Sequence, residues 1–151
     1  MFVIFDLDGT LADITHRLSY IDREACKARG ERPNWDAFHH ACVYDRPIKE
    51  MIALNQVLWL AGHRVEIWSG RSDMVYDQTV AWLQEHGVRY HQLVMRMKGD
   101  HQPDNQLKES WLNTLLDLGT KPDIVFDDRS RIVEMWRSHG IRCAQVAPGN
   151  F

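Results

Sequence analysis

Two carboxylates near the start of the chain are spaced for joint chemistry. Asp6 and Asp8 stand in the run DLDGT at residues 6–10, directly after the apolar segment Phe2–Phe5. Side chains two residues apart in an extended backbone point to the same side, so both carboxylates can reach one substrate. One can attack a phosphoryl group and form an acyl phosphate, while the other donates and accepts a proton. Taken alone, the pair fits an acidic turn equally well.

Other groups suited to a phosphoryl site follow or begin other predicted elements. Asp127 and Asp128 can add oxygen ligands for a divalent cation, which cancels the repulsion between an anionic nucleophile and an anionic substrate. Mg²⁺ is the expected cation, because it prefers hard oxygens and binds through one or two carboxylates plus substrate phosphate. Ser69 offers a hydroxyl and Lys108 a cation to the phosphate oxygens. The combination favours a phosphohydrolase over an acidic turn.

The elements that must position these groups alternate along the chain. Short apolar runs predict strands, and the amphipathic segments between them predict helices of about ten to fifteen residues. This order indicates an α/β fold with a Rossmann-like, doubly wound parallel sheet of about five strands. Ligands of such sheets bind beyond the carboxyl ends of the strands, where the polar motifs fall. The expected strands are Phe2–Phe5, Arg64–Trp68, His91–Met95, Asp123–Phe126 and Arg142–Val146, and the expected helices are Pro47–Leu60, 72–86, Gln106–Leu118 and Ser130–His139.

A single domain is expected from the 151 residues, with a core of residues 1–12 and 47–151. Residues 13–46 are too long for an ordinary connection between a strand and a helix, and we interpret them as a small helical cap inserted after the first strand. Two short cap helices, Ser19–Arg29 and Asn34–Val43, are expected. Acidic and basic residues are equal in number in this segment, so it is not a basic arm.

Composition narrows the class of protein. The 18 Lys and Arg against 21 Asp and Glu give a net charge of −3, which disfavours broad binding of duplex DNA through its phosphates. The three cysteines lack CxxC spacing, and this predicts neither a disulfide framework nor a zinc site. No apolar run approaches the length of a membrane span, and no secretory leader is recognised. A cytoplasmic protein without membrane association is expected, and its oligomeric state is not predicted.

The motifs resemble those of the haloacid dehalogenase superfamily of phosphohydrolases. They read FDLDGTLAD at residues 5–13, SGR at 69–71, Lys108 near the start of a helix, and DDR at 127–129. Within that superfamily the chain is similar to the 3′-phosphatase domain of phage-type polynucleotide kinase/3′-phosphatase, and residues 126–151 carry much of this likeness. The chain contains no GxxxxGK[ST] loop, so kinase activity is not expected.

The resemblance implies catalytic and metal-binding roles position by position. Asp6 would be the nucleophile that becomes phosphorylated, and Asp8 would protonate the leaving oxygen and then activate water. Lys108 would hold phosphate oxygens. Mg²⁺ would be held by Asp6, the backbone carbonyl of Asp8, and the pair Asp127 and Asp128, one of them directly or through water.

The resemblance also implies a substrate-binding set. Arg17, Arg71 and Asp104 occupy places that the 3′-phosphatase domain uses and that generic superfamily members do not need. The two arginines would clamp the substrate phosphate, unless they only pair with nearby acids, and Asp104 would tether Lys108 or Arg71, unless it is only an acid favoured at a helix start. The complete expected set is Thr10, Arg17, Ser69, Gly70, Arg71 and Asp104.

Five further side chains could contribute to a site or only to the structure. Arg129 is expected to neutralise the neighbouring acids, and Arg96 is a candidate substrate contact. Trp35 could stack on a nucleobase, but packing in the core is favoured. His39 and His40 are expected at the surface, because adjacent residues of a helix face different directions.

The expected activity is removal of a 3′-phosphate from a nucleotide or a nucleic-acid end by a Mg²⁺-dependent phosphomonoesterase. The alternative is a 5′-nucleotidase or a broad small-molecule phosphatase, which the acidic net charge and the missing kinase motif favour. A non-catalytic module of the same fold would be expected to lack Asp8, and Asp8 is present.

Overall fold

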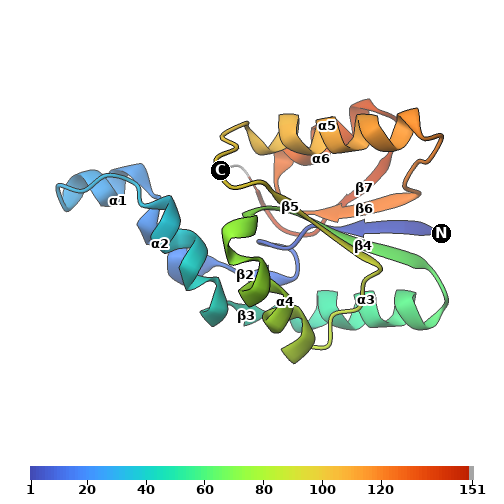
Figure 1. The fold of residues 1–151 in the computed structure, drawn as a ribbon, viewed down its shortest axis with the longest axis horizontal. Helices are drawn as coiled ribbons and strands as arrows, with labels where there is room; N and C mark the ends of the chain where they lie inside the picture. The colour runs from blue at the N-terminus through green and yellow to red at the C-terminus, as the bar shows by residue number, and fades with distance from the viewer. Residues whose placement is uncertain (150–151) are drawn as a thin grey trace.

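A parallel sheet forms the centre of the molecule (Figure 1). The computed structural model describes residues 1–149 of the chain. Within them the main sheet has five strands in the order β5-β4-β1-β6-β7, and every neighbouring pair is parallel. The α/β fold predicted from the alternating elements is confirmed. The strands are β1 (Phe2–Phe5), β4 (Arg64–Ser72), β5 (Gln92–Arg96), β6 (Ile124–Asp127) and β7 (Arg142–Gln145).

Helices cover both faces of this sheet. In Figure 1, α3 (Lys49–Leu60) and α4 (Tyr76–Glu85) lie below the sheet, and α5 (Asp104–Asp117) and α6 (Ser130–Ser138) lie above it. A 3₁₀ turn, η3 (Asp73–Val75), leads from β4 into α4. None of the helices in residues 1–149 has the length and apolarity needed to cross a membrane.

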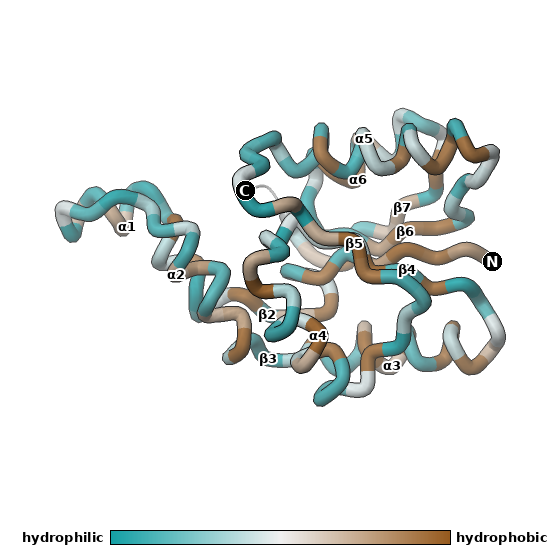
Figure 2. Tube along the Cα trace, in the orientation of Figure 1, coloured by the Kyte–Doolittle hydropathy of each residue, from teal (hydrophilic) through white to brown (hydrophobic). Residues whose placement is uncertain are grey.

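The central strand β1 explains why two cores form. Alternate side chains of a strand point to opposite faces. Phe2 and Ile4 therefore pack in the hydrophobic cluster on the side of α5 and α6, which includes Trp136. Val3 and Phe5 pack in the cluster on the side of α3 and α4. The chain trace of β1 and β4 is accordingly among the most hydrophobic parts of the molecule (Figure 2).

The boundaries of three elements differ from those predicted. Strand β4 continues past Trp68 to Ser72, because β5 pairs with it as far as Arg96 across a register shift between Ser69 and Ser72. Helix α5 begins at Asp104 rather than Gln106, directly after a proline that cannot continue a helix towards the N-terminus. Pro47 lies in a short strand, and the helix after it begins at Lys49.

Residues between β1 and α3 form the projecting part at the left of Figure 1. Strands β2 (Ala12–Asp13) and β3 (Arg46–Pro47) pair antiparallel at its base. The two predicted helices are each divided: Asp22 caps a new helix inside the first by accepting the Ala25 N–H, and the second, capped by Asn34 at its predicted start, changes to a 3₁₀ turn at Ala41. The helical segments are η1 (Thr15–Tyr20), α1 (Arg23–Ala28), α2 (Trp35–His40) and η2 (Ala41–Tyr44).

Two expectations about α2 are wrong. Trp35, expected in a core, is 54% exposed, because it begins a helix of only six residues that projects from the core. His39, expected at the surface, is 9% exposed, because it faces inward next to Phe38. His40 is exposed as expected. Burial lowers the pKa of His39 to about 4; the Asp8 carboxylate opposes this shift, and the charges of Arg17 and Arg71 reinforce it.

The buried His39 predicts a specific loss of stability in acid. Its pKa is about 4 in the folded chain and about 6.5 in an unfolded chain, so only the unfolded state takes up the proton as the pH falls through this window. Between pH 7 and pH 5 this should cost about 2 kcal/mol of unfolding free energy. Urea denaturation should show a His39→Gln variant losing less stability than the parent over this range.

The neighbouring His40 supplies the matched control. His40→Gln should lose as much stability between pH 7 and pH 5 as the parent, because His40 is exposed. Equal acid sensitivity of the His39→Gln and His40→Gln variants would show that His39 does not resist protonation in the folded state.

Candidate active site

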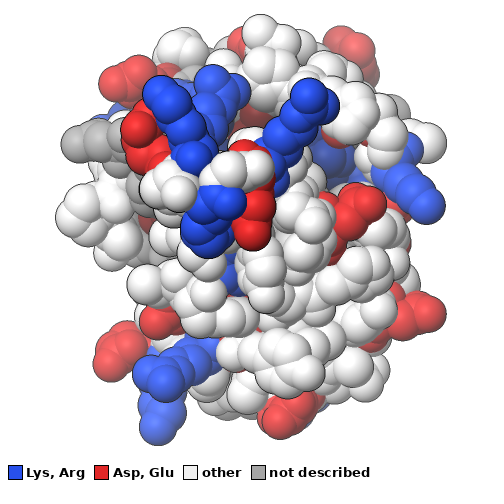
Figure 3. Space-filling model, turned by 90° about the vertical axis from the view of Figure 1, so that its left-hand side faces the viewer, with Lys and Arg blue, Asp and Glu red and all other residues white. Residues whose placement is uncertain are grey.

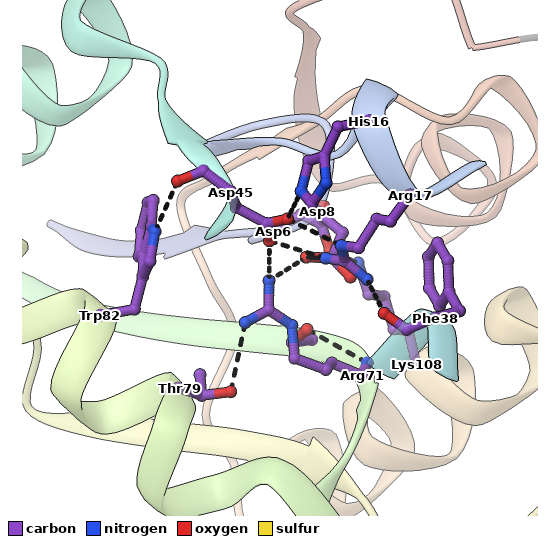
Figure 4. Close-up of polar contacts among 11 residues, drawn as sticks. Asp6, Asp8, His16, Arg17, Phe38, Asp45, Arg71, Thr79, Trp82 and Lys108 are labelled. Carbon is purple, nitrogen blue, oxygen red and sulfur yellow. Dashed lines mark hydrogen bonds and ion pairs between the residues drawn. The ribbon is translucent and has the colours of Figure 1, made fainter. Parts of the chain in front are cut away.

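A cleft of about 610 Å³ lies at the carboxyl ends of the strands, with lining residues from the sheet edge, from α2 and from the loop after β5. Residues from separate sequence motifs meet there because parallel strands end at one edge of the sheet. Figure 4 shows several of them pointing toward one another. Of the predicted site residues, the cleft is lined by Asp6, Asp8, Gly70, Arg71, Asp104, Lys108 and Asp127.

Lys108 joins two of the carboxylates. Its ammonium group donates hydrogen bonds to Asp6 Oδ1 at 2.6 Å and to Asp127 Oδ2 at 2.7 Å, and the residue is only 1% exposed. Burial alone would lower the pKa of Lys108, but the charges of Asp127 and Asp6 outweigh it and raise the pKa. Lys108 therefore carries a positive charge that is fixed beside Asp6.

Asp6, Asp127 and Asp128 form a buried acidic cluster whose ligand oxygens lie within 4.8 Å of one another. Burial raises the pKa of Asp6 well above its ordinary value; Lys108 opposes this shift, and the charges of Asp127 and Asp128 reinforce it. Burial and the Asp127 charge raise the pKa of Asp128 to about 6. Asp128 Oδ1 is buried and accepts no hydrogen bond within the described part of the chain. Excess negative charge and an unpartnered oxygen fit a hard divalent cation.

The backbone around the first motif brings this cluster together. The Asp6 N–H donates to the carbonyl of Phe126 at 2.9 Å, which holds the end of β1 beside the end of β6. Gly9 has a φ of +92°, and a Cβ atom at this position would collide with the Asp128 carboxylate. Glycine alone combines that backbone conformation with so close an approach, so Gly9 is needed for the turn after Asp8 to fit.

Asp8 belongs to a second group of charges, separate from the acidic cluster. Arg17 donates to Asp8 Oδ1 at 2.8 Å and to the two oxygens of Asp45 at 2.7 and 2.8 Å. Arg71 also pairs with Asp8, and it donates to Asp45 Oδ2 at 2.8 Å. Figure 4 shows the two guanidinium groups between the two carboxylates. We call these four residues the arginine–aspartate network.

The network determines the charge of Asp8. Burial would raise the pKa of Asp8, but the charges of Arg71 and Arg17 outweigh burial and lower the pKa to about 2. Burial would lower the pKa of Arg71, and Asp8 more than reverses this effect. Without a ligand, Asp8 is therefore a carboxylate ion at neutral pH, and both arginines are cations.

Asp45 is the member of this network that the sequence interpretation missed. Its side chain is fully buried and also lies 2.9 Å from His16 Nε2, while its backbone carbonyl accepts a hydrogen bond from the Trp82 indole at 2.9 Å. Its place in the sequence marks it only as one of the acidic residues of segment 13–46. Two arginines expected at one site need more than one carboxylate partner. Asp45 stands directly before the chain returns to the core, and this position was a signal available in the sequence.

Several predicted substrate-binding residues lie beside the cleft rather than on its lining. Arg17 is fully buried, and the Thr10 hydroxyl is buried without a hydrogen-bond partner in the described region. Ser69 is also buried, and its Oγ accepts the Arg71 N–H at 3.1 Å. Gly70 and Arg71 reach the lining. The extra backbone at the register shift in β4 therefore presents residues 70 and 71 to the cleft.

Asp104 has different partners from those expected. It pairs with Arg96 and with Arg129, not with Lys108 or Arg71. Arg96 also donates to the carbonyls of Gly70 at 2.9 Å and Gln102 at 2.7 Å. The reason is that Arg96 ends β5 next to the start of α5, whereas Arg71 is turned toward the arginine–aspartate network. Arg129, expected to neutralise the acidic cluster, pairs with Asp104, but its charge also opposes the rise in the pKa of Asp128 and its backbone N–H donates to Asp127 Oδ1 at 3.1 Å.

Solved structures share this architecture. A structure described as the Pnkp1/Rnl/Hen1 RNA repair complex contains a chain with a TM-score of 0.81 and 24% identity, covering 99% of this chain and 43% of that one. A second structure of a Pnkp1/Rnl/Hen1 complex gives a TM-score of 0.80 and 25% identity over 99% of this chain and 47% of that one. The present chain thus spans less than half the length of either.

A smaller hydrolase is more distantly similar to this chain. A hydrolase from Streptococcus pneumoniae TIGR4 gives a TM-score of 0.61 at 16% identity, and the match covers 97% of this chain and 92% of that one. This likeness supports the fold alone.

The family comparison covers the whole sequence. Residues 1–151 match the family described as the polynucleotide kinase PNKP phosphatase domain. The chain therefore belongs to the family of polynucleotide kinase PNKP phosphatase domains and is a phosphatase of the haloacid dehalogenase type.

Proposed function

We propose that this phosphatase removes 3′-phosphate groups from nucleic-acid or nucleotide ends, using Mg²⁺ and a phosphorylated Asp6. The observation that carries the proposal is the convergence of Asp6, Asp127, Lys108 and the arginine-bound Asp8 on one cleft. Membership of a polynucleotide kinase phosphatase family supports the substrate class, as do neighbours described as parts of an RNA repair complex.

Asp6 is the proposed nucleophile. It lies at the base of the cleft, and Lys108 contacts one of its two oxygens, which leaves the other available to phosphorus. Attack forms a bond from Asp6 to phosphorus and breaks the bond from phosphorus to the ester oxygen. Water then attacks the phosphorus, inorganic phosphate leaves, and the Asp6 carboxylate is restored. The Lys108 cation offsets negative charge on the transferring group throughout.

The acidic cluster is the proposed place of Mg²⁺. Asp6, Asp127 and Asp128 would supply its carboxylate ligands, and the Asp8 carbonyl is the further ligand expected from the sequence. When bound, the cation neutralises the charges of nucleophile and phosphate and polarises the phosphoryl oxygens.

Asp8 is the proposed acid and base. It must donate one proton to the leaving oxygen and later accept one from water. As an ion paired with Arg17 and Arg71 it has no proton to give. A bound phosphate brings negative charge to the same arginines, which weakens their hold on Asp8 and raises its affinity for a proton. Substrate binding thus prepares Asp8 for its first step.

Substitution of Asp6 and of Asp8 should lower the activity in both cases but change the stability differently. Asp6→Asn should lower kcat by roughly four orders of magnitude or more. Its unfolding free energy should stay equal or rise, because one charge leaves a repulsive cluster. Asp8→Asn should lower kcat by about 10²–10⁴-fold. It should also lose about 1–3 kcal/mol of stability, because two buried arginines lose a charged acceptor.

Phosphate release and urea denaturation of both variants provide these values. Substantial turnover by Asp6→Asn would exclude the covalent route. An Asp8→Asn variant as stable as the parent would show that Asp8 is not a structural partner of the arginines.

Metal binding is testable without turnover. Mg²⁺ at about 100 times its Kd should stabilise the folded chain by about 2.7 kcal/mol and raise its Tm, and a chelator should remove both this gain and the activity. Asp128→Asn should lose most of the gain. Asp117→Asn, which changes an exposed acid on α5, should keep it. Equal Mg²⁺ responses of these two variants would place the ion elsewhere.

A direct comparison of substrates decides the proposed specificity. Purified protein with Mg²⁺ should release phosphate faster from a 3′-phosphorylated oligonucleotide than from 3′- or 5′-mononucleotides at the same concentration. A preference for 5′-mononucleotides would keep the chemistry of Asp6 and Asp8 but establish the alternative function, a 5′-nucleotidase.

A further inference from the structure

The cleft continues well beyond the groups assigned to phosphate chemistry. Its lining extends from Asp6 to Trp35 on α2 and to the loop of residues 97–103 after β5. A phosphate group needs only the part beside Asp6, so the remaining space is available to the rest of the substrate. The features of this outer part indicate what it accommodates.

Trp35 presents an exposed indole to the cleft. It is 54% exposed although it is a large aromatic residue, and its orientation is held by its neighbours. The ring meets Phe38 edge to face at a centroid distance of 5.6 Å and His39 at 6.2 Å. A platform held by packing on one side binds a flat ligand with little loss of side-chain entropy.

The same aromatic group is connected to the catalytic charges. The Arg17 guanidinium lies 4.2 Å from the centre of the Phe38 ring, and it also donates to the Phe38 carbonyl at 3.3 Å. Arg17 in turn contacts Asp8. Phe38 and Arg17 therefore connect the indole of Trp35 to the proposed acid, which puts the platform near the chemistry, where the terminal nucleotide would lie.

The loop on the other side of the cleft is held in position. Arg96 donates to the carbonyls of Asp100 at 3.1 Å and Gln102 at 2.7 Å, and the Lys98 N–H donates to Asp73 at 2.8 Å. This arrangement presents Met97, which is 73% exposed, to the cleft. A thioether is a polarisable surface that suits contact with an aromatic ring.

The outer cleft carries charges of both signs. Lys98 and Arg131 line it and form no ion pair within residues 1–149, and Asp36 and Asp100 line it as well. Seen from the side of the projecting segment, Lys and Arg side chains gather in the upper part of the surface, with acidic side chains between them (Figure 3). A nucleic-acid strand could therefore approach despite the net charge of −3.

We propose that Trp35 is a base-stacking residue that holds the nucleobase of the 3′-terminal nucleotide, with Met97 on the opposite side of the cleft. The proposal rests on the proposed 3′-phosphatase function and adds a specificity-determining residue to it. Stacking accepts any of the four bases, because each has an aromatic face. The enzyme should thus distinguish a terminal nucleotide that has a base from one that lacks it.

The test compares two 3′-phosphorylated oligonucleotides, one with a normal terminal nucleotide and one whose terminal sugar has no base. The parent should favour the first by roughly 10-fold in kcat/KM. Trp35→Ala should reduce this ratio to about one while hydrolysing the abasic substrate as the parent does. Trp35→Phe should restore much of the ratio, because phenylalanine keeps an aromatic face. Tyr44→Ala, which removes an aromatic side chain that is 77% exposed and does not line the cleft, should behave as the parent.

Each outcome has one meaning. Equal activity of the parent on both oligonucleotides would overturn base stacking and leave the 3′-phosphatase function intact. A Trp35→Ala variant that loses activity equally on both substrates would show that Trp35 only maintains the shape of the cleft, which also overturns the proposal. Activity of the parent on neither oligonucleotide, with phosphate release from a 5′-mononucleotide only, would mean that the proposed function itself fails.

Discussion

The arginine–aspartate network is the interaction on which the arrangement of this molecule depends. Asp8 and Arg71 come from the ends of two core strands, whereas Arg17 and Asp45 come from the two ends of the projecting segment. Buried charges are tolerated only in well-matched pairs. Two cations and two anions satisfy one another here, so the segment can lie against the core only in the position in which these four groups meet.

The acidic cluster follows the opposite principle. Lys108 bonds Asp6 and Asp127, Asp128 lies beside them, and burial together with repulsion among the three carboxylates raises the pKa values of Asp6 and Asp128. The charges of the arginine–aspartate network balance one another, whereas the neighbouring acidic cluster keeps an excess of negative charge. The two sites meet between Asp6 and Asp8, which stand two residues apart after β1, so one short turn joins a balanced charge group to one with an excess of negative charge.

Sequence patterns predicted the core better than the projecting segment, for a physical reason. Five strands and four helices bury long periodic faces, and the motifs at the strand ends then fall together by topology. In α1 and α2, six residues each, there is too little periodicity to tell which face is inward, so the positions of Trp35 and His39 were predicted wrongly. The partners of Asp104 and the role of Asp45 depend on contacts between distant segments, which spacing along the chain does not encode.

The paired strands β2 and β3 have a consequence for how such a domain can diverge. They bring the two ends of the inserted segment side by side, so the intervening chain closes a loop whose stem is already formed. Lengthening a loop with fixed ends costs little conformational entropy. Helices between Leu18 and Tyr44 can therefore be exchanged or enlarged during evolution while Arg17 and Asp45, at the edges of the stem, keep the hydrolytic machinery in register. The stem allows the helices of the inserted segment, including the one that carries Trp35, to change while the chemical scaffold stays the same.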